Sequence, residues 1–243
     1  MKRAFIPVLM TSLLSIAHST FAQNPPVSDR NLILTEGIAE VRGQNDSARI
    51  SIAVVTDGAN LEQTSSDNAS KTKAVLKAIK GLNIKKLKLK TSNYRVTPQR
   101  DHKARPPKIK GYEVHNTIEV TLEEFEPEHL SKYVSKIVGK AMESGANNIH
   151  GIQFYIKNKE PLEKEALTHA TQEAMARART LAKAAGVKLK RIASLSTHPI
   201  HVPPRPYMLR AANMKAEAGA AAPPIEIGES QIRVQVSLAY EIE

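Results

Sequence analysis

The residues that could do chemistry in this 243-residue chain are carboxylates, histidines and a run of basic side chains. The carboxylates gather in one cluster around Pro127, made of Glu123, Glu124, Glu126 and Glu128. Paired carboxylates can transfer protons when one of them is desolvated. Pro127, however, is typical of the first turn of a helix, where the helix dipole stabilises negative charge. We therefore expect these glutamates to flank a helix N-terminus.

The histidines do not show the spacing of a metal site. His198 and His201 are three residues apart, but Pro199 lies between them and disfavours a helical face that would carry both. A bound metal needs several ligands that converge with a fixed geometry, and the chain has no cysteine. The remaining candidates are scattered along the chain, at His102, His115, His129, His150 and His169. We expect surface histidines and no metal.

The short motifs that position a nucleophile or a phosphate are also absent from the sequence. It contains neither a Gly-x-Ser-x-Gly turn nor a glycine-rich phosphate loop. The lack of tryptophan and an aromatic content of 4% disfavour a surface on which sugars or bases stack. We expect no catalytic residue, no cofactor and no nucleic-acid partner, and we interpret the chain as a non-enzyme.

A basic segment at 71–110 is the feature that best suits recognition of a partner. It holds 14 lysines and arginines against one acidic residue, Asp101, whereas the whole chain has a formal charge of +11. Such an asymmetry concerns partners and solubility rather than fold. The side chains expected to bind an anion or a partner are Lys86, Lys88, Lys90, Arg95, Arg100, Lys103, Arg105, Lys108 and Lys110. The alternative is that these residues face solvent and discourage strand edges from pairing.

The N-terminus has the pattern of a secretory signal peptide. Lys2 and Arg3 precede a short apolar run that closes on small residues at Ala22. We expect a signal peptide at 1–22, a flexible lead at 23–31 and a folded domain at 32–243. The predicted location is the periplasm or the outer membrane, where disulfides are available. Since the chain has no cysteine, its core alone must stabilise the fold.

Alternating and helical apolar patterns predict that this domain is α+β. We expect one mixed, largely antiparallel sheet with three helices packed on it. The predicted strands cover 31–42, 48–56, 84–96, 111–122, 149–157, 189–196 and 231–243, and the predicted helices cover 61–80, 127–145 and 161–185. A turn at 43–46 is expected to join the first two strands as a hairpin, and a basic loop is expected at 97–108.

The predicted helices differ in the residues that they bury. In the first, the expected buried stripe is Ala69, Thr72, Val75, Leu76 and Ile79, and in the second it is Leu130, Val134, Ile137, Val138, Ala141 and Met142. The third carries Leu162, Ala166, Ala170, Ala174, Ala178, Leu181 and Ala185. So many alanines at helical spacing allow the helix backbone to lie close to its neighbour.

Two features concern the organisation of the domain. The segments 80–84 and 144–149 are weakly similar, either because a strand–helix–strand unit is duplicated or because two ordinary helix ends resemble each other by chance. The segment 197–224 is rich in proline and alanine and too long for an ordinary connection. It is either disordered or an arm that packs on a neighbouring subunit, and we therefore expect a homo-oligomer.

Several local patterns together resemble the SIMPL-domain family of bacterial envelope proteins. The matching stretches, in order, are 34–41 with a central glycine, 91–98, 109–112, 145–149 with 152–154, 181–187 and 224–229. The resemblance covers 32–242 and implies a periplasmic or outer-membrane-associated protein, sometimes oligomeric, with a role in oxidative-stress defence. It implies no catalytic residue. The chain departs from the family at Gln99 and Arg100, where an aromatic residue is common.

Three functional hypotheses remain open from the sequence. The first is a non-enzymatic envelope protein of the SIMPL type that acts by binding or self-assembly. The second is a hydrolase whose site is assembled from dispersed residues, which a desolvated carboxyl or histidine with a shifted pKa would favour. The third is a protein that binds anionic membrane surfaces through the segment 71–110, with an affinity that falls as salt rises.

Overall fold

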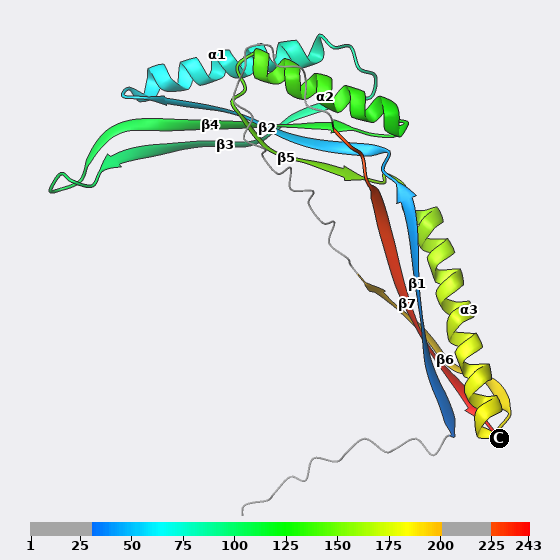
Figure 1. Cartoon of the computed structure of the whole chain (residues 1–243). Coiled ribbons are helices and arrows are strands. Elements are labelled where there is room, and N and C mark those ends of the chain that lie inside the picture. Colours follow the sequence, from blue (N-terminus) through cyan, green and yellow to red (C-terminus); the bar gives the residue numbers. More distant parts are fainter. Residues whose placement is uncertain (1–30, 201–224) are drawn as a thin grey trace, which may run out of the picture. The chain divides into compact units, whose positions relative to one another are not determined.

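The computed structural model describes residues 31–200 and 225–243, which form an α+β fold (Figure 1). The elements in chain order are β1 (Leu32–Gln44), β2 (Ser47–Gly58), α1 (Leu61–Lys80), β3 (Lys88–Asp101), β4 (Lys108–Leu122), α2 (Pro127–Glu143), β5 (Asn148–Tyr155), α3 (Glu160–Ala185), β6 (Leu189–Ile200) and β7 (Glu229–Ile242). The predicted class is confirmed. The expected signal peptide, most of the lead and most of the segment 197–224 lie outside the described residues.

The strands form two antiparallel sheets instead of the single mixed sheet that we expected. The three-stranded sheet has the order β1-β7-β6, and the four-stranded sheet has the order β3-β4-β2-β5. The hairpin predicted for the first two strands is wrong, because β1 pairs with β7 while β2 pairs with β4 and β5. The turn between β1 and β2 instead contacts the segment just before β7, because the buried Asn45 side chain donates to the Gly228 carbonyl at 2.5 Å.

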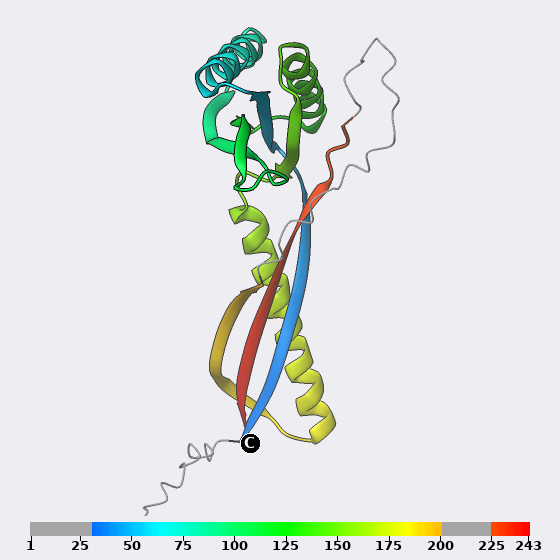
Figure 2. The same ribbon diagram turned by 90° about the vertical axis from the view of Figure 1, so that its left-hand side faces the viewer.

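In the three-stranded sheet, α3 packs along β1 and β7 (Figure 2). The alanine stripe lies against the sheet, with Ala166, Ala170, Ala174, Ala178 and Ala182 buried. The contact is very close, since a Cβ added to Gly37 of β1 would lie 1.9 Å from the Ala170 carbonyl oxygen. The predicted end of the stripe is wrong, because Leu181 is 49% exposed and Ala185 is also exposed, while Ala182 is buried instead.

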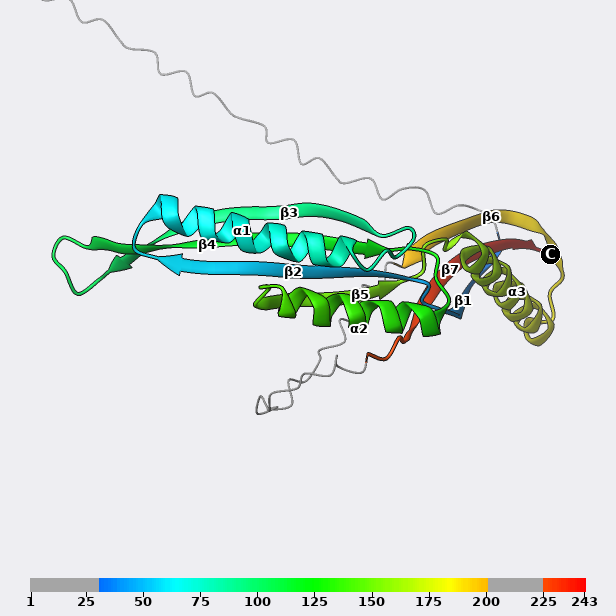
Figure 3. The same ribbon diagram turned by 90° about the horizontal axis from the view of Figure 1, so that it is seen from above.

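In the four-stranded sheet, α1 and α2 cover one face (Figure 3). Two strand–helix–strand stretches, β2-α1-β3 and β4-α2-β5, interleave so that every neighbouring pair of strands is antiparallel. This is the arrangement of a split βαβ fold. The duplication suggested by the weak repeat stays a prediction.

The core of the four-stranded sheet consists of branched aliphatic side chains. The largest fully buried ones are Ile50, Ile52, Val54, Val75, Ile79, Val114, Ile118, Val120, Leu122, Leu130, Val134 and Ile137. The inward face of β4 thus consists of Val114, Ile118, Val120 and Leu122. Two predicted core positions are wrong: Met142 is 47% exposed, and on α1 the buried residue is Asn68 instead of Ala69.

The basic loop predicted at 97–108 is also wrong in its length. The strand β3 continues to Asp101 and β4 begins at Lys108, because cross-strand pairs extend as far as Asp101 opposite Lys108. Pro98 lies inside β3, which is possible because β3 is an edge strand. Similarly, the predicted loop at 197–224 begins late, since β6 runs to Ile200.

Candidate functional site

The nine basic residues predicted to bind an anion divide into two groups in the structure. The first group is paired with acidic residues at the far end of β4. Lys86 Nζ lies 2.9 Å from Glu124 Oε2, and Lys88 Nζ lies 2.6 Å from Glu123 Oε2. Lys90 Nζ lies 3.0 Å from Glu119 Oε1. The charge of these three lysines is therefore compensated within the protein.

Glu123 lies at the centre of this paired group. Its carboxylate also accepts from Lys157 Nζ at 2.5 Å and from the Tyr155 hydroxyl at 3.4 Å. The hydrogen bonds from Lys157 and then Lys88 lower the pKa of Glu123 from about 4.5 to about 2. The Lys86 hydrogen bond lowers the pKa of Glu124 in the same direction. These carboxyl groups stay ionised, which is the opposite of what a general acid needs.

The glutamate cluster is thus divided between two roles. Glu126 is the N-cap residue of α2 and Glu128 lies in its first turn, as expected for acidic residues at a helix N-terminus. Glu123 instead pairs with Lys88, the first residue of β3, and Glu124 pairs with Lys86, two positions earlier, so both glutamates tie this segment to the end of β4. The sequence interpretation missed these pairs because the partners are 35 and 38 positions apart.

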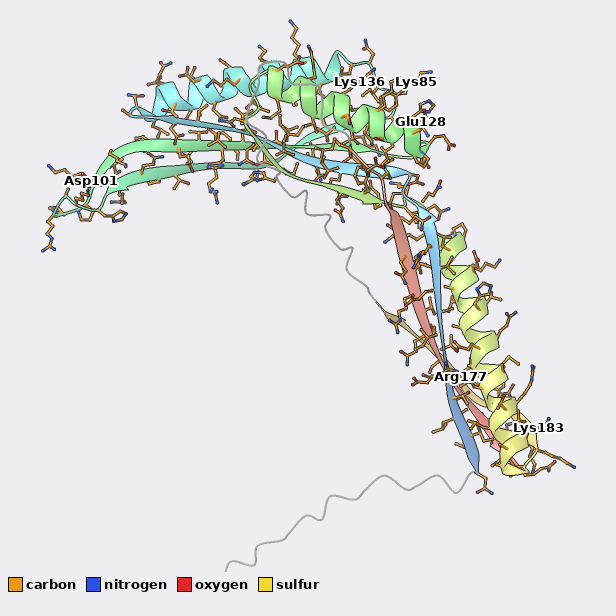
Figure 4. All side chains as sticks on the ribbon, viewed as in Figure 1. Lys85, Asp101, Glu128, Lys136, Arg177 and Lys183 are labelled. Atoms are coloured by element: carbon orange, nitrogen blue, oxygen red, sulfur yellow. The ribbon has the colours of Figure 1, made fainter. Side chains whose placement is uncertain are left out.

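The second basic group lies on the β3–β4 hairpin and has no such partners. It consists of Arg95, Arg100, Lys103, Arg105, Lys108 and Lys110, and none of these side chains forms an ion pair with another described residue. The acidic residue among them, Asp101, lies near the turn (Figure 4) and accepts from the backbone N–H of Lys103 at 2.9 Å. This part of the chain therefore keeps a net positive charge.

The far part of this hairpin is only two strands wide. The pairing of β2 with β4 ends at Gly58 opposite Tyr112, so residues 99–111, here called the hairpin tip, have no third strand beside them. Figures 1 and 3 show the hairpin running past the end of α1. Cations at the hairpin tip are therefore open to solvent on both faces of the ribbon.

The alternation of the two strands distributes these charges over both faces. Arg95 pairs with His115 on the face that the helices leave uncovered, whereas Arg100, five positions further along β3, lies on the opposite face by alternation. Lys108 pairs with Asp101, six positions from Arg95 on β3, and therefore lies on the same face as Arg95. Ile109 is 47% exposed and lies among the cations.

The uncovered face of the four-stranded sheet holds polar pairs but no metal-binding cluster. His115 Nε2 lies 2.5 Å from Glu113 Oε1, two residues away on β4. Within the residues that the structure describes, no three histidine, aspartate or glutamate side chains converge as a metal site would require. Of the His198 and His201 pair, the side chain of the first and the whole of the second lie outside the described residues.

A second candidate region, which sequence analysis did not identify, lies along the edge of β1. A groove of about 580 Å³ runs between this edge and α3. Its lining residues are Leu34, Thr35, Glu36, Glu173, Ala176, Arg177, Thr180 and Leu181. We call it the β1 groove. Leu34 and Leu181 are 70% and 49% exposed, so the groove presents apolar surface to solvent.

Two side chains of α3 cover the middle of the β1 edge. Glu173 Oε2 accepts from the Ile38 N–H at 2.7 Å, and Arg177 Nη1 donates to the Glu36 carbonyl at 3.0 Å. The two side chains are themselves paired at 2.5 Å, and Figure 4 shows Arg177 on α3 beside the strands. Backbone groups that an edge strand would offer to another strand are thus occupied at Glu36 and Ile38.

The opposite edge of the same sheet is also apolar. Ile192 and Leu195 of β6 pair with Tyr240 and Leu238 and therefore point to the side that carries α3. Because α3 packs on β1 and β7, these two side chains remain 44% and 53% exposed. Alternation in the sequence shows that a strand has an apolar face, but it does not show how far a helix covers that face.

None of the described helices has both the length and the apolar character that crossing a membrane would require.

The sequence is similar to known bacterial proteins over almost its whole length. It is 25% identical to the "26 kDa periplasmic immunogenic protein" of Brucella melitensis over 249 residues, which covers 99% of this chain and 96% of the relative. It is 24% identical to the "Uncharacterized protein YggE" of Escherichia coli strain K12 over 242 residues, which covers 98% of this chain and 94% of the relative.

The family comparison covers both sheets and all three helices. The sequence model described as "SIMPL: Protein of unknown function (DUF541)" matches residues 33–240. The match includes Gly37, on which α3 packs, and the whole β3–β4 hairpin. This extent, together with the relatives that align from end to end, shows that the chain belongs to the SIMPL family.

Proposed function

We propose that this chain is a non-enzymatic protein of the bacterial periplasm that acts by binding and by self-assembly. The periplasmic location is supported by the name of the Brucella relative and by the signal-peptide pattern of residues 1–22. A non-enzymatic role is supported by the lack of nucleophile and phosphate-loop motifs in the sequence and by the lowered pKa of Glu123, which speaks against that residue as a general acid. The oxidative-stress role implied by the family resemblance stays a hypothesis, because the chain has no reactive thiol.

The observation that carries self-assembly is the pair of apolar edges on the three-stranded sheet. Leu34 and Leu181 lie at the β1 edge, and Ile192 and Leu195 lie at the β6 edge. Contiguous apolar surface of this kind marks interaction sites in soluble proteins. The partner that we infer is a second copy of this chain. A head-to-tail contact would place the β6 edge of one copy on the β1 edge of the next, so each contact buries one edge of each kind.

The experiment is a measurement of mass in solution, by light scattering, for the chain from Gln23 to Glu243. The double variant Ile192→Gln, Leu195→Gln should shift the mass distribution toward the monomer, because glutamine removes apolar burial from the contact. The control is Leu167→Gln on α3, which is 37% exposed and lies outside the β1 groove. A parent protein that is monomeric at high concentration, or a double variant with unchanged mass, would contradict self-assembly through this sheet.

A further inference from the structure

We propose that the hairpin tip, residues 99–111, docks on the surface of a bilayer that contains anionic phospholipids. The inference deepens the binding half of the proposed function and does not depend on self-assembly. It selects, from the nine basic residues predicted to bind an anion, the five at the hairpin tip, because three of the others are paired with acidic residues in the structure. Lys86, Lys88 and Lys90 are each paired with a glutamate, so they add little to the positive potential at the protein surface. The five cations of the hairpin tip form no ion pair with any residue in the described ranges, and they are Arg100, Lys103, Arg105, Lys108 and Lys110.

The shape of the hairpin tip suits a flat array of phosphates. A small anion bound in a pocket would need cations that converge on it. The cations of the hairpin tip instead lie on both faces and around the turn of a two-stranded ribbon. A ribbon of this kind can approach a charged plane end-on, with every cation near a headgroup. Arginine donates in a fork that matches phosphate oxygens, and lysine adds a point charge.

The apolar residues of the hairpin point to a bilayer as the partner in preference to an acidic protein. Ile109 is 47% exposed between Lys108 and Lys110, and Tyr94 is 54% exposed further along β3. An aliphatic side chain flanked by cations is the pattern of peripheral segments that enter the headgroup region. Nothing else in this ribbon forms an apolar core that a protein interface would need at its centre. A lipid surface therefore satisfies both the charge and the exposed isoleucine.

The test is co-sedimentation of the chain from Gln23 to Glu243 with vesicles of phosphatidylethanolamine containing phosphatidylglycerol. The triple variant Arg100→Gln, Lys103→Gln, Arg105→Gln should bind about 100-fold more weakly than the parent, because each cation near an anionic surface changes the affinity roughly five-fold. Binding of the parent should also weaken steeply as salt rises. Vesicles of phosphatidylcholine alone should retain neither protein.

The matched control is Lys164→Gln, Arg179→Gln, Lys183→Gln, which removes the same charge from exposed positions of α3. It should bind the anionic vesicles within a few-fold of the parent. Equal losses in the two triple variants would show an effect of net charge alone and would overturn the proposal. So would an absence of parent binding, or binding that ignores ionic strength.

The same samples separate this proposal from self-assembly. The hairpin-tip triple variant should keep the mass and the thermal unfolding midpoint of the parent, since its three residues are exposed and lie outside the three-stranded sheet. The Ile192→Gln, Leu195→Gln variant should change mass while each monomer keeps its cationic tip. A chain that binds anionic vesicles but stays monomeric would support the lipid surface and contradict self-assembly.

Discussion

The two sheets of this protein hold their helices by different physical means. In the four-stranded sheet, branched side chains of α1, α2, β2 and β4 interdigitate and fill the space between the layers. In the three-stranded sheet, the backbone of α3 lies almost directly on Gly37, and Thr35 Oγ1 donates to the Ala174 carbonyl at 2.9 Å. The first arrangement depends on the volume of its side chains. The second depends on the absence of side-chain volume at one position.

The sheets also differ in how they treat their exposed edges. At the start of β3, lysines pair with glutamates of the β4 end and leave the distal hairpin strongly cationic. At β1, the paired Glu173 and Arg177 side chains occupy backbone groups of the edge itself. One edge is therefore protected by charge and the other by side chains from a packed helix. The three-stranded sheet also exposes apolar side chains at both edges, at Leu34 and Leu195.

The largest expected effect would come from adding a single methyl group to the three-stranded sheet. Gly37→Ala should lower the free energy of unfolding by about 3 kcal/mol, since its Cβ would meet backbone atoms of Ala170 and Ala174 and α3 would have to move. Urea denaturation measures the change. The control is Gly151→Ala on β5, where a Cβ meets nothing within 4 Å, and we expect a change within about 0.5 kcal/mol. Similar losses in both variants would remove the distinction between the sheets.

A smaller effect should come from the one buried amide of the four-stranded sheet's helix layer. Asn68 Nδ2 donates to the carbonyls of Val54 and Val114 at 2.9 and 3.0 Å, so α1 is tied to β2 and β4 by hydrogen bonds as well as by packing. Asn68→Ala should lower the unfolding free energy by about 2 kcal/mol, about one for each buried hydrogen bond. Ser66→Ala on the exposed side of α1 is the control. A neutral Asn68→Ala would show that packing alone holds this helix.

The smallest effect concerns the charged edge and depends on pH. The pKa of Glu123 lies near 2 in the folded protein and near 4.5 otherwise, so its stabilisation is complete above about pH 5 and is lost as pH falls toward 2. The double variant Lys88→Gln, Lys157→Gln removes both partners. Its stability should therefore be below that of the parent at pH 6, and the difference should shrink as pH falls through this window.

Urea denaturation at a series of pH values checks this prediction, and Lys136→Gln, on the exposed side of α2, serves as the control. A difference between parent and double variant that is constant from pH 6 to pH 2 would show that Glu123 does not titrate against these lysines.

The local patterns of the sequence predicted most of the elements. Strict alternation at the C-terminal end predicted β7, and three of its inward residues, Val234, Val236 and Leu238, are buried. Helical spacing of alanine predicted both α3 and its close packing, although it did not identify Gly37 as the residue on which the helix lies. Composition and the N-terminal pattern predicted export, and the order of local motifs predicted the SIMPL family.

Tertiary structure alone decided which strands pair, which charges are compensated and which apolar faces stay open. The sequence could not show that β1 leaves β2 to pair with β7, whose paired residues lie 185 to 209 positions away. Nor could it divide the basic residues into those held by Glu119, Glu123 and Glu124 and those left at the hairpin tip. The physical reason is the range of the forces: periodicity records only how one segment meets an interface, whereas strand pairing, ion pairs and helix coverage depend on segments that meet only in the folded chain.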